Sequence, residues 1–206
     1  MDINAFLEKV KTHLKQKYEC HTIILYGSYN TGDYSEDSDI DIICFTDKSD
    51  DQNEVELFEG KQLDVWIYNT NKMRNHTQYL RVNKGKILFN DKGLAERFLS
   101  EIEKVFNEGP KKLSTKEKEF LKTWLRKMKL RSNNNDIEGN YRFHWMLKDS
   151  LEIYFELKGL WYLGPKKSFN WLYKNDKVAY NLFKNAFEKN KNTNDIEQLL
   201  EYLYEI

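Results

Sequence analysis

The sequence lacks an excess of either charge and any long apolar run. Lysine plus arginine and aspartate plus glutamate each number 33, so no surplus of positive charge exists to follow a nucleic-acid backbone. A long polynucleotide is therefore not the expected partner, although a local basic patch can still bind a nucleotide. No apolar stretch approaches the roughly 18 residues that a membrane-spanning helix needs, and we expect no association with a membrane.

Cysteine is scarce as well. Cys20 and Cys44 form no metal-ligand spacing such as C-x-x-C, and each lies beside or within an apolar run. This placement indicates buried free thiols in a reducing compartment. The first residues, MDINAFLEKVKTHLKQ, have the pattern of an amphipathic helix and not of a signal peptide, so we expect a cytoplasmic protein.

Apolar and aromatic residues are abundant, at 40% and 15% of the 206 residues, which is enough for two small domains with separate cores. After a helix at residues 3–17, strand-like runs occupy residues 21–26, 40–45, 63–68 and 85–89. Residues 47–54 are predicted to be a loop, residues 74–84 to be helical or irregular, and residues 94–106 to form a helix.

The Gly109-Pro110 pair marks a break, after which strand signals vanish. Helices are predicted over residues 115–132, 141–160, 168–174, 178–190 and 195–204. Strands followed by a run of helices indicate an α+β fold, with an α+β domain at residues 1–110 and an all-α domain at residues 111–206.

The stretch GSYNTGDYSEDSDID, residues 27–41, carries the chemistry. Asp39 and Asp41 are two apart on one predicted strand, so their side chains leave the same face and can converge. Two carboxylates held together repel each other, an arrangement that a divalent cation between them stabilises. Asp64, on a neighbouring strand, can supply a third ligand.

Gly27 and Ser28 follow directly after a predicted buried strand. Backbone N–H groups and a hydroxyl at such a turn can hold phosphate oxygens, and glycine lets the phosphate approach the backbone. A metal site and a phosphate site in one loop predict a metal-bound nucleoside triphosphate and a phosphoryl-type transfer. The residues between them, Tyr29 to Ser38, are predicted to be a solvated connector.

The pattern of Gly27-Ser28, ten residues, and then Asp39-x-Asp41, with Asp64 on a later strand, resembles the signature of the DNA polymerase β-like nucleotidyltransferase superfamily. The resemblance covers about residues 1–110 and implies a catalytic domain with a mixed sheet flanked by helices. Residues 111–206 resemble, more weakly, the helical substrate-binding domain of small bacterial nucleotidyltransferases related to aminoglycoside adenylyltransferases.

This resemblance implies a transfer that uses two Mg²⁺ ions and releases pyrophosphate. Asp39 and Asp41 would bind both ions, and Asp64 would bind the ion that activates the acceptor. Ser28 and the backbone at Gly27 would hold the β and γ phosphates. The expected donor is ATP or another nucleoside triphosphate, and the expected acceptor is a hydroxyl of a small molecule such as an aminoglycoside-like antibiotic, which points to antibiotic resistance.

Two other functions stay open: a protein-modifying nucleotidyltransferase of the antitoxin type, and a nucleotide-binding regulatory module without catalysis. A homodimer also stays open, because some related enzymes build their cleft across a dimer. Three basic residues after the third predicted strand could neutralise the triphosphate, and the sequence does not choose among them: Arg74, Arg81 and Lys84.

His144, Lys148 and Glu152 recur every four residues and form one polar stripe on an otherwise apolar predicted helix. The simpler interpretation is a surface stripe. The alternative is that the stripe faces the substrate and that Glu152 deprotonates the acceptor hydroxyl, as a helical-domain glutamate does in some related aminoglycoside enzymes.

Overall fold

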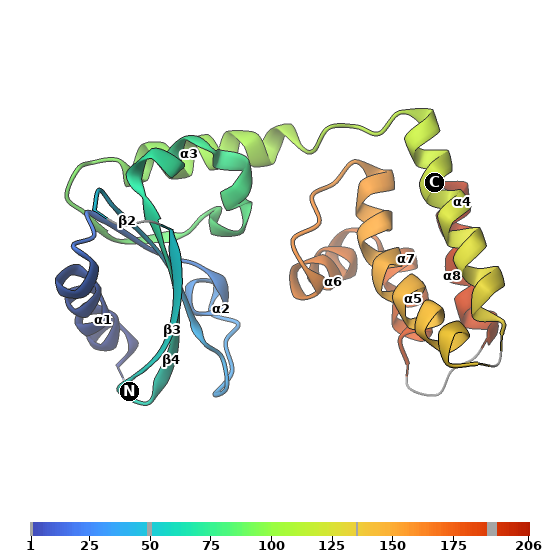
Figure 1. Cartoon of the computed structure of the whole chain (residues 1–206), viewed down its shortest axis with the longest axis horizontal. Coiled ribbons are helices and arrows are strands. Elements are labelled where there is room, and N and C mark those ends of the chain that lie inside the picture. The colour runs from blue at the N-terminus through green and yellow to red at the C-terminus, as the bar shows by residue number, and fades with distance from the viewer. Residues whose placement is uncertain (1, 49–50, 135, 189–192) are drawn as a thin grey trace. The chain divides into compact units, whose positions relative to one another are not determined.

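The computed structural model describes residues 2–48, 51–134, 136–188 and 193–206 (Figure 1). The chain divides into two compact units, Met1–Glu108 and Gly109–Ile206, each with its own hydrophobic core. The first unit combines a sheet with helices and the second is helical, so the predicted α+β class is confirmed.

The first unit contains a mixed five-stranded sheet of order β3-β4-β2-β1-β5. In this order only β2 and β4 pair in parallel, and the other neighbours are antiparallel. Its elements are α1 (Ile3–Tyr18), β1 (Thr22–Leu25), α2 (Gly27–Thr31), β2 (Ile40–Thr46), β3 (Gln52–Phe58), β4 (Lys61–Asn69), the 3-10 helices η1 (Thr70–Arg74) and η2 (His76–Val82), β5 (Lys86–Asn90) and α3 (Ala95–Glu108).

Helix α1 covers one face of this sheet, and α2 lies on the other side (Figure 1). Phe6, Val10 and Leu14 follow the helical period and are buried against the sheet, as the sequence pattern predicts. Alternate residues of the central strands, including Ile42 and Val65, pack into the same cluster. Because side chains alternate along a strand, the residues between them project to the opposite face.

Part of that opposite face is covered near the ends of β2 and β4. The ring of Phe45 lies 5.0 Å from the ring of Phe98 on α3, and the ring of Tyr68 lies 5.3 Å from that of Tyr79 on η2. Asp41 and Asp64 lie on this face of the sheet, four residues before Phe45 and Tyr68 respectively.

Strand β3 is absent from the sequence prediction, which gave a loop at residues 47–54. That prediction is wrong from Gln52 onward, and residues 49 and 50 lie outside the described chain. Glu59 and Gly60 both have positive φ, 45° and 83°, and join β3 to β4 in a two-residue hairpin. An edge strand can have few buried residues, so β3 is acidic and lacks the apolar run by which the other strands were predicted.

The second unit consists of α4 (Thr115–Ser132), α5 (Ile137–Lys158), α6 (Pro165–Asn175), α7 (Lys177–Ala186) and α8 (Thr193–Glu205). Ser114 and Glu117 form a capping box at the start of α4, where the sequence places a cap. The helix predicted over residues 178–190 ends at Ala186, and its last two predicted residues lie outside the described part.

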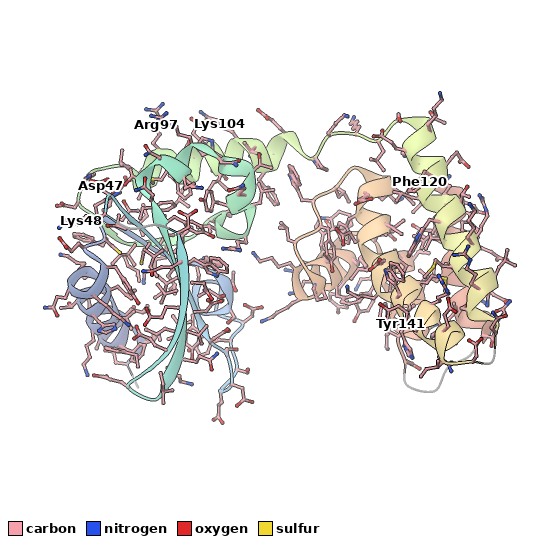
Figure 2. All side chains as sticks on the ribbon, viewed as in Figure 1. Asp47, Lys48, Arg97, Lys104, Phe120 and Tyr141 are labelled. Carbon is pink, nitrogen blue, oxygen red and sulfur yellow. The ribbon has the colours of Figure 1, made fainter. Side chains whose placement is uncertain are left out.

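The core of the second unit forms around α5. The Asp176 carboxylate accepts hydrogen bonds from the hydroxyls of Tyr154, at 2.7 Å, and Tyr202, at 3.0 Å. Phe120 on α4 and Tyr141 on α5, labelled in Figure 2, are exposed. Across the residues that the structure describes, no helix combines the length and apolarity needed to cross a membrane.

Candidate active site

Three acids meet on the face of the sheet opposite α1. Asp39 directly precedes β2, Asp41 is the second residue of β2, and Asp64 is paired with Asp41 in the parallel register of β2 and β4. One carboxylate oxygen from each of the three lies within 4.8 Å of the others, and all three residues are half-buried. The structure therefore brings together the three acids that the sequence selects.

This acid cluster fits a magnesium site. Its donors are all carboxylate oxygens, the ligand type that Mg²⁺ prefers, and partial exposure leaves room for the water and phosphate ligands that Mg²⁺ keeps. Repulsion among three carboxylates this close would favour a bound divalent cation. Their role as metal ligands stays a prediction.

Gly27 lies directly against the carboxylate of Asp41. Its φ is +69°, and a Cβ built on it would lie 1.9 Å from Oδ2 of Asp41, so any side chain here would require the Asp41 carboxylate to move. The neighbouring backbone N–H of Tyr26 donates to the carbonyl oxygen of Asp41 at 3.0 Å. Glycine at position 27 is thus needed for the approach of the loop to the acid cluster, in addition to any contact with phosphate.

The Gly27-Ser28 turn predicted from the sequence is the first turn of the short helix α2, which ends where the N–H of Gly32 donates to the carbonyl oxygen of Ser28 at 2.9 Å. Ser28 is half-buried. The solvated connector predicted to begin at Tyr29 is wrong at that residue, because Tyr29 is buried and its ring stacks on Tyr34 at 4.2 Å.

Asn53 is the neighbour of the acid cluster that the sequence interpretation missed. Its amide Nδ2 donates to Oδ1 of Asp64 at 2.6 Å, across the β3–β4 pair. This bond orients the Asp64 carboxylate, as hydrogen bonds to metal-binding carboxylates do. The Glu59-Gly60 turn and the alternation after Asn53 are the signals that could have revealed β3 and, with it, this residue.

Of the three basic candidates, Arg81 has its guanidinium on the acid-bearing face. It lies 5.0 Å from the ring of Trp66 and 5.7 Å from the ring of Tyr26. Burial raises the pKa of Tyr26, and the positive charge of Arg81 opposes this rise. The negative charges of Asp41 and Asp64 raise the same pKa further, so these groups lie close enough to interact electrostatically.

The other two basic candidates have different surroundings. Lys84 has a φ of +61°, and its carbonyl oxygen accepts a hydrogen bond from Asn30 of α2 at 3.0 Å, so its backbone anchors that helix. Arg74 lines a groove of about 560 Å³ with His76 and Arg97, beyond the opposite end of β4 from Asp64.

Glu152 lies on α5 in the second unit. His144, Lys148 and Glu152 are all exposed, as expected for a surface stripe. Burial raises the pKa of Glu156, and the negative charge of Glu152 adds to the rise. The role of Glu152 as a general base stays a prediction.

Comparison with known proteins gives three similarities. A family model described as "Nucleotidyltransferase domain" matches residues 7–154, so the match runs past residue 110 and into α5. A protein of Methanocaldococcus jannaschii named "Putative protein adenylyltransferase" is 44% identical over 48 residues, 23% of this chain. That segment is 48% of the relative, so the chain matches about half of its length.

The third similarity is to a crystal structure of a nucleotidyltransferase-like protein from Exiguobacterium sibiricum. It aligns with a TM-score of 0.47 and 11% identity, over 97% of this chain and 73% of that chain.

Proposed function

The chain belongs to the nucleotidyltransferase domain family, and on this premise we propose that it transfers a nucleoside monophosphate, AMP from ATP, to a hydroxyl group with release of pyrophosphate. The observation that carries the proposal is the acid cluster, with oxygens of Asp39, Asp41 and Asp64 within 4.8 Å of one another beside Gly27. Two buried free cysteines, Cys20 and Cys44, support a reducing, cytoplasmic location.

In this proposal Asp39, Asp41 and Asp64 would hold two Mg²⁺ ions. Bound Mg²⁺ neutralises phosphate charge and favours deprotonation of the acceptor hydroxyl. The hydroxyl and backbone N–H of Ser28 hold the β and γ phosphates, and the Arg81 guanidinium adds positive charge on the same face. The acceptor oxygen bonds to the α-phosphorus, the bond from that phosphorus to the bridging oxygen breaks, and pyrophosphate leaves with the electron pair.

The acceptor proposed from the sequence is a small molecule such as an aminoglycoside-like antibiotic. The helical unit Gly109–Ile206 would bind it, and Glu152 would take the hydroxyl proton. The length of the family match supports a functional connection between the two units, because it includes α4 and most of α5.

A protein acceptor is the second candidate, and it is favoured by the name of the Methanocaldococcus jannaschii relative. A regulatory module without catalysis is disfavoured, because all three acids are present and grouped. The two acceptor classes share the same donor chemistry and differ only in what supplies the hydroxyl.

The test is transfer of label from radiolabelled ATP, CTP, GTP and UTP with Mg²⁺ to aminoglycosides, lincosamides, simple alcohols and co-expressed proteins. Asp39→Asn should lower transfer by about 10²–10³-fold, the usual loss when one charge-stabilising group is removed. Asp37→Asn is the matched control, because Asp37 is an exposed acid of the same loop outside the cluster. Equal rates for the two variants would show that the mechanism is wrong.

A further inference from the structure

Strand β3 presents two aliphatic side chains to solvent beside the acid cluster. Val55 is 57% exposed and Leu57 is 78% exposed. In the antiparallel register Val55 pairs with Asp64 and Leu57 pairs with Gln62, so both lie on the acid-bearing face. The two side chains are neighbours on one face beside the proposed reaction centre, and their burial by a partner would stabilise an interface.

Strand β3 is also the edge of the sheet, since its one strand neighbour in the described chain is β4. The outer side of an edge strand carries a row of unpaired N–H and C=O groups, which another extended chain can pair with. Proteins usually block such edges with charges or proline on the strand. On the acid-bearing face, β3 instead exposes the aliphatic residues Val55 and Leu57.

The opposite side of β3 is fixed to α1. His13 and Lys17 each lie 2.8 Å from a carboxylate oxygen of Glu56, and Lys17 also bonds to Glu54. The strand is therefore held in position, while no other strand of the described chain pairs with its outer edge. Lys17 is the one lysine or arginine that contacts these two carboxylates in the described chain, and His13 is the other basic partner. The acidic groups thus outnumber the lysines here, and a basic side chain on an added strand would complement them.

We propose that β3 is the docking site for an extended segment of an acceptor polypeptide, which pairs with Gln52–Phe58 as an additional strand and presents its hydroxyl to the acid cluster. The segment has aliphatic residues over Val55 and Leu57 and lysine or arginine on the side of Glu54 and Glu56. This inference rests on the proposed function in its protein-acceptor form. An added strand lies about 5 Å from β3 and about 10 Å from β4, which carries Asp64.

The same chemistry disfavours a second copy of β3 as the occupant. Antiparallel pairing of two β3 strands would bring Glu54 and Glu56 of both copies together on one face, where like charges are destabilising.

In the docked complex the hydroxyl oxygen of the segment bonds to the α-phosphorus, pyrophosphate leaves with the electron pair of the broken bond, and the hydroxyl proton goes to solvent.

The test uses short synthetic peptides that alternate valine and lysine and carry one serine, threonine or tyrosine. The control peptides have glutamate in place of lysine. Radiolabelled ATP with Mg²⁺ should label a lysine peptide, and the glutamate peptides should be labelled about tenfold less or worse. Hydrogen exchange at the amides of residues 52–58 should slow when the lysine peptide is added.

Leu57→Asp places a charge on the open edge, and because Leu57 is 78% exposed the fold is retained. We expect kcat/KM for the peptide to fall about tenfold or more, with KM for ATP within about twofold of wild type. Leu130→Asp is the matched control, because Leu130 on α4 is 70% exposed, and it should label the peptide as wild type does.

Transfer to the acceptor panel of the proposed function separates the possible failures. Absence of transfer to every member of that panel and to the peptides would refute the proposed function itself. Transfer to a member of the panel with no labelling of any lysine peptide, or equal peptide labelling by Leu57→Asp and wild type, would refute docking on β3 alone. A dimer that Leu57→Asp converts to a monomer would show that the edge is a self-interface and would also overturn the proposal.

Discussion

Replacement of Gly27 by alanine tests how the acid cluster is built. Gly27 has a φ of +69°, and the left-handed conformation costs an L-residue about 1–2 kcal/mol. The new Cβ would also lie 1.9 Å from Oδ2 of Asp41, and crowding of this kind costs about 1–3 kcal/mol. If Asp41 keeps its position, the two costs together predict a destabilisation of roughly 2–5 kcal/mol, a large part of typical domain stability.

The crowding can be relieved if the Asp41 carboxylate rotates away, which removes it from its position beside Asp39 and Asp64. A displacement of about 1 Å in a catalytic group can lower a rate by about 10²-fold. Gly27→Ala should therefore reduce nucleotide transfer by about this factor even at saturating ATP and Mg²⁺. Urea unfolding measures the stability, and label transfer from ATP measures the activity.

Gly32→Ala is the matched control. Gly32 has a φ of +81°, and a Cβ on it would meet no atom within 4 Å, so this variant carries the backbone cost without the crowding. We expect a loss of about 1–2 kcal/mol in stability and unchanged transfer. Wild-type transfer by Gly27→Ala, or a loss of transfer in Gly32→Ala as large as that in Gly27→Ala, would refute the reasoning.

Three further predictions concern other contacts. Asn53→Ala removes the 2.6 Å hydrogen bond to Asp64 and should lower activity about 10-fold or more, with a higher Mg²⁺ requirement in a titration; an unchanged requirement would contradict it. Asp176→Ala removes the acceptor of the Tyr154 hydroxyl and should lower the free energy of unfolding by about 2–3 kcal/mol in a urea titration, whereas Asp176→Asn should lose less. Burial lowers the pKa of His21, so the folded state disfavours the imidazolium, and stability should fall as the pH drops through about 6.5 towards the lowered pKa. The free energy of unfolding, measured at about pH 7.5 and pH 5.5, should change less in His21→Gln than in wild type. An identical change in both proteins would show that His21 is not the source of the pH dependence.

The grouping of the acids was predictable in part. Asp39 and Asp41 were expected to share a face, because side chains alternate along a strand, although Asp39 lies just before the first residue of β2. The position of Asp64 depended on the parallel pairing of β2 with β4, a contact between segments that are distant in the sequence, and local patterns do not determine such a register. The sequence identified the residue type and the strand, and the fold supplied the pairing of Asp64 with Asp41.

Gly27 shows a different limit of sequence interpretation. A glycine after a buried strand is explained equally well by phosphate approach and by contact with a neighbouring side chain. The structure shows that the space beside Gly27 is filled by the Asp41 carboxylate, so a requirement for glycine follows even without a nucleotide. The contact with Asp41 is one reason for glycine here, phosphate approach stays a prediction, and sequence alone cannot separate the two.

Strand β3 explains why the acceptor is harder to predict than the donor. The proposed donor chemistry depends on acids at β2 and β4, whose spacing is a recognisable motif. The groups that orient Asp64 and border its face, Asn53 and Leu57, come from an edge strand that carries no motif and whose acidic residues conceal its strand character. A polypeptide that paired with β3 would be held by these residues, and only its hydroxyl would reach the acids of the motif. Acceptor choice can therefore change with β3 while the acid cluster stays the same, and variants of β3 should alter acceptor preference more than the use of ATP.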